Sequence, residues 1–392
     1  MKVQIGEVFY FIQNGANIKQ GVVDGGIPIT RIETISNNQF NRDRMGYAGI
    51  TDVQKYTPYI LQDGDILMSH INSLAYLGRA VLYNKQNNET IIHGMNLLRL
   101  KANREIILPA YACYFFQTNA FKEQINRIAK KSVNQASFSV ADLKRTVMSV
   151  VPLEEQNKIV SRLDKFNSLI SLRKKQLQKL DDLVKSRFAE MFGDSGKQVL
   201  LSDYVWFQEG PGVRSVDFTQ SGTILLTGSN INDNEISFGY KSDRFVSNGL
   251  ATGKYAHFIC DENDVLVVSS AIDPEKFDKK VTIVKEGNKY CLNTGIIRFK
   301  PNKKYLTLGY FIEFLKTDYF KHQVMEEMRG IAQMHFGPSH LKKMTLLLPP
   351  SLEKQMEFDN FIAAVDNTKL TVQQGLDKLE LLKQSLMQKY FG

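Results

Sequence analysis

The chain has 392 residues, 43% of them apolar, with 50 Lys and Arg against 41 Asp and Glu and a formal net charge of +9. This composition is typical of a globular protein of about two domains and excludes a disordered or collagen-like chain. The sequence has no run of about 18 apolar residues, which excludes a membrane-spanning protein. Cys113, Cys260 and Cys291 are far apart and odd in number, which excludes a disulfide framework or a cysteine zinc site and fits a reduced cytosolic compartment. The first residues lack the apolar segment of a signal peptide, and the positive excess alone only weakly indicates a polyanionic partner.

In chain order, short β-branched and aromatic runs predict strands at 65–68, 81–83, 265–268 and 282–284, each bounded by polar turns. Two aromatic-rich stretches, 109–129 and 306–328, have helical spacing. We expect their aromatic side chains to face a core; a base-stacking platform is the alternative. The sequence therefore predicts two mixed α+β domains, 1–152 and 194–351.

An internal repeat relates the two halves of the chain. Residues 153–193 align without a gap to residues 352–392, an offset of 199 (352 minus 153), with ten identical positions. Upstream of these segments, identical residues recur at an offset of 198: Gln135, Phe138 and Leu143 in the first half correspond to Gln333, Phe336 and Leu341 in the second. Between such anchors the halves diverge almost completely. We interpret this as one architecture that reads two different targets; duplication followed by drift is the alternative, but drift would not spare the last forty residues so selectively.

The repeated segments 153–193 and 352–392 each carry apolar residues at alternating spacings of four and three, which predicts a long helix with a heptad seam. Pro152 and Pro350 precede these helices, and Phe-Gly ends both. We expect the two helices to pair with each other as an antiparallel coiled coil, a rod of roughly 58 Å. Two surface helices, each packed on its own domain, are the alternative. The seam contains charged residues at Arg173, Lys369 and Lys383, which are expected to fix the register.

Three groups of polar residues are candidates for DNA contact. Arg, Asn and Gln can make bidentate contacts to guanine and adenine edges, and Lys suits phosphates. The two helical segments carry net charges of +3 and −1, so the globular segments hold +7 of the +9. Solvated surface is the alternative for each residue. The candidates are Asn38, Arg42 and Arg44; Ser69, His70 and Asn72, with Ser269, Ser270, Lys276, Lys279 and Lys280 as their counterparts; and Lys130, Lys131 and Gln135, with Arg329, Gln333 and His335.

A catalytic site is not indicated. The sequence contains no P-loop, no G-x-S-x-G, no H-E-x-x-H and no G-x-G-x-x-G that opens a helix. His335 and His340 have no neighbouring carboxylate or cysteine in the sequence and form a poor metal site. Pro349-Pro350 lacks the flanking Asn or Asp and the aromatic residue of the amino-methyltransferase motif. We therefore predict no catalytic residue, no metal site and no cofactor in this chain.

Several motifs resemble the specificity subunit of Type I restriction–modification systems. Pro152-Leu153-Glu154-Glu155-Gln156 and its counterpart at 350–355 are similar to that family's P-L-x-E-Q helix entry, and Gly64–Ser69 is similar to its G-D-I-L-x-S strand. The resemblance extends over essentially the whole chain, twice. Asn263 replaces the glycine of the strand motif in the second copy, and Ser351 is an extra residue in the second helix entry.

The resemblance implies two target-recognition domains, 1–152 and 194–351, joined by conserved spacer helices, 153–193 and 352–392, with pseudo-two-fold symmetry. Each domain would read one half of a bipartite, asymmetric site on double-stranded DNA. Two modification subunits would methylate adenine with S-adenosylmethionine, and restriction subunits would use ATP and Mg²⁺; the chain itself would be non-catalytic and cytoplasmic. A self-contained DNA-modifying enzyme and a coiled-coil DNA-binding regulator are the alternatives.

Overall fold

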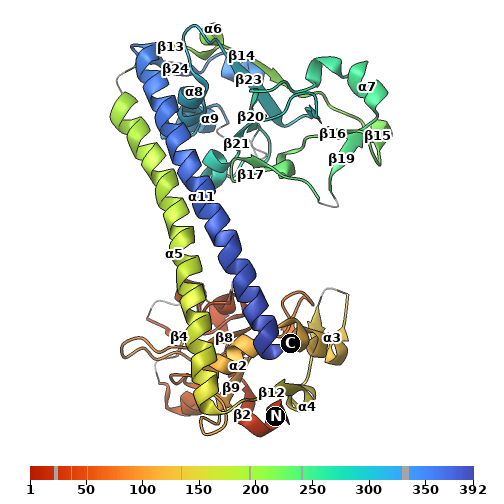
Figure 1. Cartoon of the computed structure of the whole chain (residues 1–392), viewed down its shortest axis with the longest axis vertical. Helices are drawn as coiled ribbons and strands as arrows, with labels where there is room; N and C mark the ends of the chain where they lie inside the picture. The colour runs from red at the N-terminus through yellow and green to blue at the C-terminus, as the bar shows by residue number, and fades with distance from the viewer. Residues whose placement is uncertain are drawn as a thin grey trace. The chain divides into compact units, whose positions relative to one another are not determined.

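The chain folds into two compact units in the computed structural model (Figure 1). Unit 1 comprises residues 1–174 and 374–392, and unit 2 comprises residues 175–373. Each unit contains one copy of the globular repeat and a part of both long helices, which confirms the expected α+β tandem repeat. No helix in the described part of the chain is long and apolar enough to cross a membrane. The structure describes residues 1–21, 25–36, 38–50, 52–133, 135–193, 196–239, 242–328 and 335–392.

Unit 1 is built on an antiparallel sheet of four strands in the order β2-β9-β6-β8. Its strands are β2 (Phe9–Asn14), β9 (Leu97–Ala102), β6 (Ile66–Ser69) and β8 (Ala80–Leu82). The central strand β6 is buried throughout, and its side chains alternate between two cores. Ile66 and Met68 pack with the helices, whereas Leu67 packs with Ile35 and Tyr83 on the other face.

The remaining elements of unit 1 surround this sheet. Its helices are α1 (Ile5–Val8), α2 (Pro109–Phe115), α3 (Asn119–Ile128) and α4 (Val140–Arg145). Its other strands are β1 (Lys2–Gln4), β3 (Gln20–Gly21), β4 (Ile27–Ile29), β5 (Gly46–Ala48), β7 (Ile71–Asn72), β10 (Lys130–Lys131), β11 (Ala136–Ser137) and β12 (Val147–Ser149). Short 3₁₀ turns lie at Ile32–Ile35, Arg42–Arg44 and Gln54–Tyr59.

Unit 2 repeats the four-stranded antiparallel sheet in the equivalent order β14-β23-β20-β21. Its strands are β14 (Val205–Glu209), β23 (Ile296–Pro301), β20 (Val265–Val268) and β21 (Val281–Ile283). As in unit 1, the central strand is fully buried and alternates between two cores: Val265 and Val267 face the helices, and Leu266 and Val268 face the other side. The four predicted strands are thus confirmed.

The second unit has a larger accessory sheet, β15-β19-β16-β22, where unit 1 has β3-β5-β4. Its helices are α6 (Leu201–Tyr204), α7 (Asn248–Thr252), α8 (Leu308–Leu315), α9 (Asp318–Glu327) and α10 (Pro338–Leu341). Its other strands are β13 (Lys197–Leu200), β15 (Phe218–Thr219), β16 (Thr223–Leu225), β17 (Ile231–Asn232), β18 (Glu235–Ile236), β19 (Arg244–Val246), β22 (Tyr290–Cys291) and β24 (Thr345–Leu348). Short 3₁₀ turns lie at Ser215–Asp217, Gly228–Asn230, Ala256–Phe258 and Pro274–Lys279.

The residue before the aspartate that precedes each central strand has a left-handed backbone. Gly64 has a φ of 81° and Asn263 a φ of 70°. Asparagine tolerates this region better than other residues with a side chain. The departure from the family's motif in the second copy therefore keeps the same turn.

The predicted aromatic helices face the core, which excludes the stacking-platform alternative for them. Tyr111 and Phe115 of α2 are buried, as are their counterparts Tyr310 and Phe314 of α8. The last aromatic residue of a long helix completes each cluster. Phe391 lies with its ring centroid 5.0 Å from that of Tyr111 in unit 1, and in unit 2 Phe192 lies 4.8 Å from Tyr310.

The long helices are α5 (Leu153–Phe192) and α11 (Leu352–Phe391), and they run antiparallel within each unit. In unit 1, Lys174 pairs with Glu380 at 2.8 Å, while Arg162, earlier in α5, donates a hydrogen bond to Tyr390, later in α11. In unit 2, the predicted seam residue Lys369 pairs with Asp181 at 2.6 Å. The expected pairing of the two helices is thus confirmed in both units.

A fully buried glutamine fixes the start of each long helix. The Gln156 amide oxygen accepts a hydrogen bond from the Leu108 backbone N–H, and its amide nitrogen donates to the carbonyls of Ile106 and Val151. Gln355 makes the equivalent bonds to Thr307 and Tyr305. The bonds to Ile106 and Leu108 and those to Tyr305 and Thr307 satisfy backbone groups just before α2 and α8, so the helix-entry motif ties each helix to its own globular domain.

An ion pair fixes the loop that carries the first group of candidate residues. The Arg42 guanidinium donates two hydrogen bonds to the Glu89 carboxylate, at 2.8 and 2.6 Å, and one to the Asn84 carbonyl. The buried Tyr83 hydroxyl donates to the same carboxylate at 2.9 Å. The hydrogen bonds from Arg42 lower the pKa of Glu89 to about 2, although burial opposes this shift.

We expect Gln156→Ala to lower the free energy of unfolding by about 3 kcal/mol, because three partly buried backbone groups lose their partners at about 1 kcal/mol each. Chemical denaturation followed by circular dichroism measures this loss. Gln178→Ala, at an exposed position of the same helix, is the control and should cost less than about 0.5 kcal/mol. Equal effects of the two substitutions would contradict the anchoring role.

The depressed pKa of Glu89 predicts a pH-dependent stability. A carboxylate with a lowered folded-state pKa stabilises the fold above its unfolded pKa, and this contribution disappears as the pH falls from about 4.5 to about 2. Glu89→Gln should therefore cost on the order of 2 kcal/mol at pH 7 and almost nothing at pH 2. Urea unfolding of both proteins across this range tests the prediction, with the exposed Glu105→Gln as control. A difference that does not change with pH would contradict it.

Candidate nucleic-acid interface

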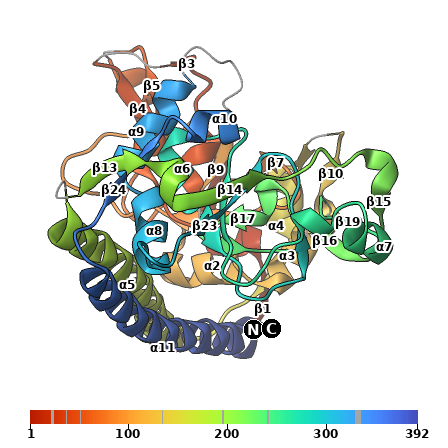
Figure 2. The ribbon, with the colours of Figure 1, turned by 90° about the horizontal axis from the view of Figure 1, so that it is seen from above.

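In unit 1, candidate residues from two distant loops meet where the central strand β6 ends; Figure 2 labels two of the strands involved, β7 and β10. His70 follows this strand, and Ile71 and Asn72 form β7. Strand β7 pairs with β11, and β11 pairs with β10, which consists of Lys130 and Lys131. The fold therefore brings Asn72 of the second group and Lys130 and Lys131 of the third group together in one small antiparallel sheet.

Unit 2 has the same backbone pairing at the end of β20. Ser270 forms an antiparallel bridge with His335, as Ile71 pairs with Ser137 in unit 1. The Phe336 N–H donates to the Ser269 carbonyl at 3.0 Å. In unit 1 the corresponding bond, from Phe138 to the His70 carbonyl, is 3.2 Å long. We call this arrangement the strand-end frame: His70, Ile71, Ser137 and Phe138 in unit 1, and Ser269, Ser270, His335 and Phe336 in unit 2.

The small sheet of unit 1 presents a basic hairpin to solvent. Lys130, Lys131 and Gln135 are exposed, and Val133 beside the turn is 99% exposed. The backbone N–H and the hydroxyl of Ser132 both donate to the Gln135 carbonyl and hold the turn. A hairpin with exposed lysines carries the charge to contact DNA phosphates.

Three other candidates lie inside the protein. The side chains of Ser69 and Ser269 are fully buried at the ends of the central strands. His70 is buried against the Phe138 ring, and burial lowers its pKa, which favours the neutral imidazole. These residues shape the strand-end frame and do not offer their side chains to a ligand from solvent.

The first group of candidates divides in the same way. Arg42 is bound to Glu89 and therefore positions its loop. Asn38 and Arg44 are exposed on either side of it. Asn38 has a left-handed φ of 56°, which its short polar side chain tolerates. These three residues thus combine one structural side chain with two that are accessible.

The lysines that follow the central strand of unit 2 have different roles. Lys280 donates hydrogen bonds to the carbonyls of Gly228 and Ile231 and to the side chain of Asn232, and burial lowers its pKa. It holds a loop in place. Lys276 and Lys279 are exposed, with surface ion pairs that contribute little to stability. Arg329 and Gln333 lie outside the described residues.

A buried ion pair at the start of each central strand was not predicted from the sequence. Arg99 pairs with Asp65 at 2.7 Å, and Arg298 pairs with Asp264 at 3.1 Å; all four side chains are almost completely buried. In both pairs the aspartate and the arginine lie 34 residues apart in the sequence. This equal spacing of Asp and Arg in the two copies of the repeat is the sequence signal that indicates the pairing.

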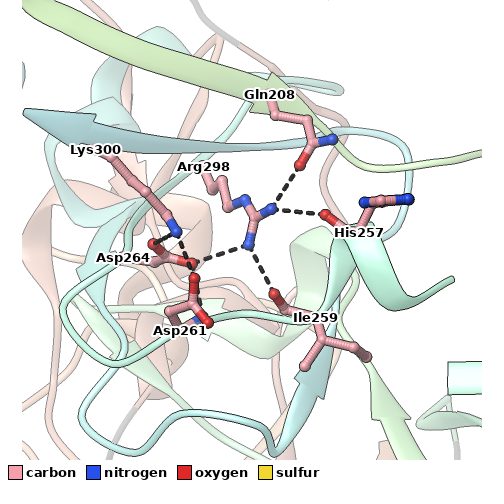
Figure 3. Close-up of polar contacts among 7 residues, drawn as sticks. All are labelled: Gln208, His257, Ile259, Asp261, Asp264, Arg298 and Lys300. Carbon is pink, nitrogen blue, oxygen red and sulfur yellow. Dashed lines mark hydrogen bonds and ion pairs between the residues drawn. The ribbon is translucent and has the colours of Figure 1, made fainter. Parts of the chain in front are cut away.

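Figure 3 shows the pair in unit 2 and the groups around it. Arg298 also donates to the carbonyls of His257 and Ile259 and to the Gln208 amide, each at 2.7 Å. Lys300 pairs with Asp261 and Asp264. Carbonyls and carboxylates thus surround the guanidinium, which is the environment that a buried charge requires. The pair stabilises the sheet and does not contribute to the exposed surface.

No arrangement typical of catalysis appears in the described part of the chain. Its His, Cys, Asp and Glu side chains form no group of three or more that could hold a metal ion. A cavity of about 310 Å³ in unit 1 lies between the loop at 38–42, α2 and α5. Its polar groups bond to one another: Tyr114 donates to Asp164 at 2.5 Å, and Asn167 donates to Tyr114.

Two known proteins with similar sequences are described as specificity subunits of type I restriction enzymes. A putative type I restriction enzyme MjaX specificity subunit from Methanocaldococcus jannaschii is 27% identical over 98% of this chain and 91% of its own length. The EcoKI specificity subunit of Escherichia coli K12 is 24% identical over 49% of this chain and 42% of its own length.

One similar solved structure is a chain from a study of complex assembly and conformational transition in the type I R-M system. It aligns over 99% of this chain and 96% of its own length, with a TM-score of 0.58 and 16% sequence identity. The S subunit of a Type-I restriction-modification system from M. genitalium aligns over 100% and 96%, with a TM-score of 0.54 and 14% identity. Both share the fold. Residues 1–182 and 205–381 match the Type I restriction modification DNA specificity domain, and the chain belongs to this family.

Proposed function

We propose that this chain is the specificity subunit of a Type I restriction–modification complex and selects the DNA sequence on which the complex acts. The observation that carries the proposal is the strand-end frame, which has the same backbone bonds in both units and different side chains at its exposed positions. A backbone arrangement that is the same in both units, with side chains that differ between them, suits two domains that read two different half-sites.

The proposed division of labour follows the repeat. Residues 1–152 and 194–351 each read one half of a bipartite asymmetric site on double-stranded DNA, and the spacer helices 153–193 and 352–392 set the gap between the halves. These helices also dock two modification subunits and the restriction subunits. Apolar side chains exposed on the helices support a docking role, because partner proteins would bury them. They are Leu169, Leu172, Leu183, Met356, Leu370, Leu381 and Leu382.

The proposed DNA contacts are the candidates whose side chains reach solvent. Lysines contact phosphates, and the amide, imidazole and guanidinium groups contact base edges. S-adenosylmethionine, ATP and Mg²⁺ belong to the partner subunits in this proposal, and the complex acts in the cytoplasm, where its DNA lies. The exposed or partly exposed candidates are Asn38, Arg44, Asn72, Lys130, Lys131, Gln135, Ser270, Lys276, Lys279 and His335.

Reconstitution tests the function directly. The purified chain alone should show no methyl transfer and no ATP hydrolysis, and site-specific adenine methylation should appear only when modification subunits are added. The control is the modification subunits without this chain, which should leave the same DNA unmethylated. Methyl transfer by the chain alone would favour a self-contained enzyme, and binding to a specific site without any effect of the subunits would favour a regulator.

Domain exchange tests the assignment of half-sites. Replacing residues 194–351 by the equivalent segment of another family member should change only one half of the recognised sequence, because the two frames are separate. Sequencing of the methylated adenines in DNA modified by the reconstituted complex measures the outcome. The reciprocal exchange of residues 1–152 should change the other half. A change in both halves after either exchange would contradict the modular arrangement.

A further inference from the structure

One solvent-accessible position at a strand end carries a different functional group in each unit. It is the last residue of the edge strand: Asn14 in β2 and Glu209 in β14. The two residues are structurally equivalent, because Asn14 pairs with Leu98 and Glu209 with Ile297, which are related by the repeat offset of 199. Neither residue was among the candidates from the sequence.

The backbone at this position is fixed in both units. A glycine follows each residue, Gly15 in unit 1 and Gly210 in unit 2. A Cβ atom at either glycine would clash with the backbone of a facing loop, at Gly94 and Asn293 respectively. The close approach explains why glycine is present, and it holds the preceding side chain in a constant place.

In unit 2, Glu209 is part of the strand-end frame through a side-chain contact. Its Oε1 lies 3.3 Å from Nε2 of His335, the residue that bridges Ser270. A Cβ atom on Gly337, at the start of α10, would lie 3.2 Å from the other carboxylate oxygen, Oε2. The side chains of Glu209 and His335 remain 23% and 42% exposed, so both can meet a ligand.

The chemistry of this pair favours one kind of ligand group. A carboxylate only accepts hydrogen bonds, so Glu209 suits a ligand group that donates one. Phosphate oxygens are also acceptors and negatively charged, so the Glu209 carboxylate would repel the DNA backbone. In the major groove, the exocyclic amino group of cytosine is the donor that glutamate suits.

We propose that Glu209, together with His335, reads the amino group of a cytosine in the half-site bound by unit 2. Asn14 occupies the same place in unit 1, where an amide suits adenine because it can donate to N7 and accept from N6. This inference rests on the proposed function and assigns two positions that determine specificity. It also predicts that the two half-sites differ in base pair at this point.

The test uses the full chain assembled with its modification subunits and a library of random double-stranded DNA. Methylated molecules are sequenced for the wild type and for Glu209→Gln, a substitution of nearly the same shape. The preference for cytosine at one position of one half-site should fall by about 5- to 150-fold, the range for one base contact, and shift toward adenine. The other half-site should not change.

Two further variants make the result decisive. His335→Asn should weaken the preference at the same position, and it serves as the test if the Glu209 variant does not assemble. The matched control is Glu326→Gln, because Glu326 forms a similar exposed pair with His322, at 3.9 Å, on α9. The control should leave the recognised sequence unchanged.

The possible outcomes separate this inference from the proposed function. A wild-type complex that methylates no defined sequence would refute the proposed function itself. If the wild type has a defined sequence that neither variant changes, the assignment of Glu209 is wrong. A loss of preference at an A·T pair would overturn the cytosine assignment.

Discussion

Each unit depends on a buried ion pair between the start of its central strand and the neighbouring strand. Asp65 and Asp264 immediately precede the central strands, and Arg99 and Arg298 come from the strands beside them. Removing one partner of such a pair leaves an uncompensated charge in the interior and typically costs about 3–5 kcal/mol. Because a central strand is only four residues long, fixing its beginning also fixes its end. The strand-end frame lies at that end, so the position of the exposed polar groups depends on this interior pair.

The long helices are attached at both ends by interactions of different kinds. Each begins with a buried glutamine that satisfies backbone groups of a globular domain, and each ends with a phenylalanine packed on an aromatic helix. Both kinds of contact are specific in geometry, whereas the seam between the helices contains exposed and partly charged positions. The repeated residues at the helix ends are therefore those that the fold requires. This requirement accounts for the identity between the two copies there.

The surface around each frame combines constant backbone geometry with variable side chains. The frame in unit 1 includes Ile71 and Ser137, and the frame in unit 2 has Ser270 and His335 at the same backbone positions. Backbone hydrogen bonds do not depend on side-chain identity, so such positions can change without loss of the fold. A protein that must recognise two unlike sequences with one architecture needs this separation between support and contact.

The repeat, the strands, the aromatic helices and the paired long helices could all be predicted from the sequence. These features follow from local periodicity and from turn residues, which report burial along one segment of chain. The sequence did not show which polar residues are accessible. Arg42 is bound to Glu89, Ser69 and Ser269 are buried, and Glu209 meets a histidine far away in the chain. Strand register and loop packing settle the accessibility of these side chains, because they bring together residues that no local sequence pattern relates.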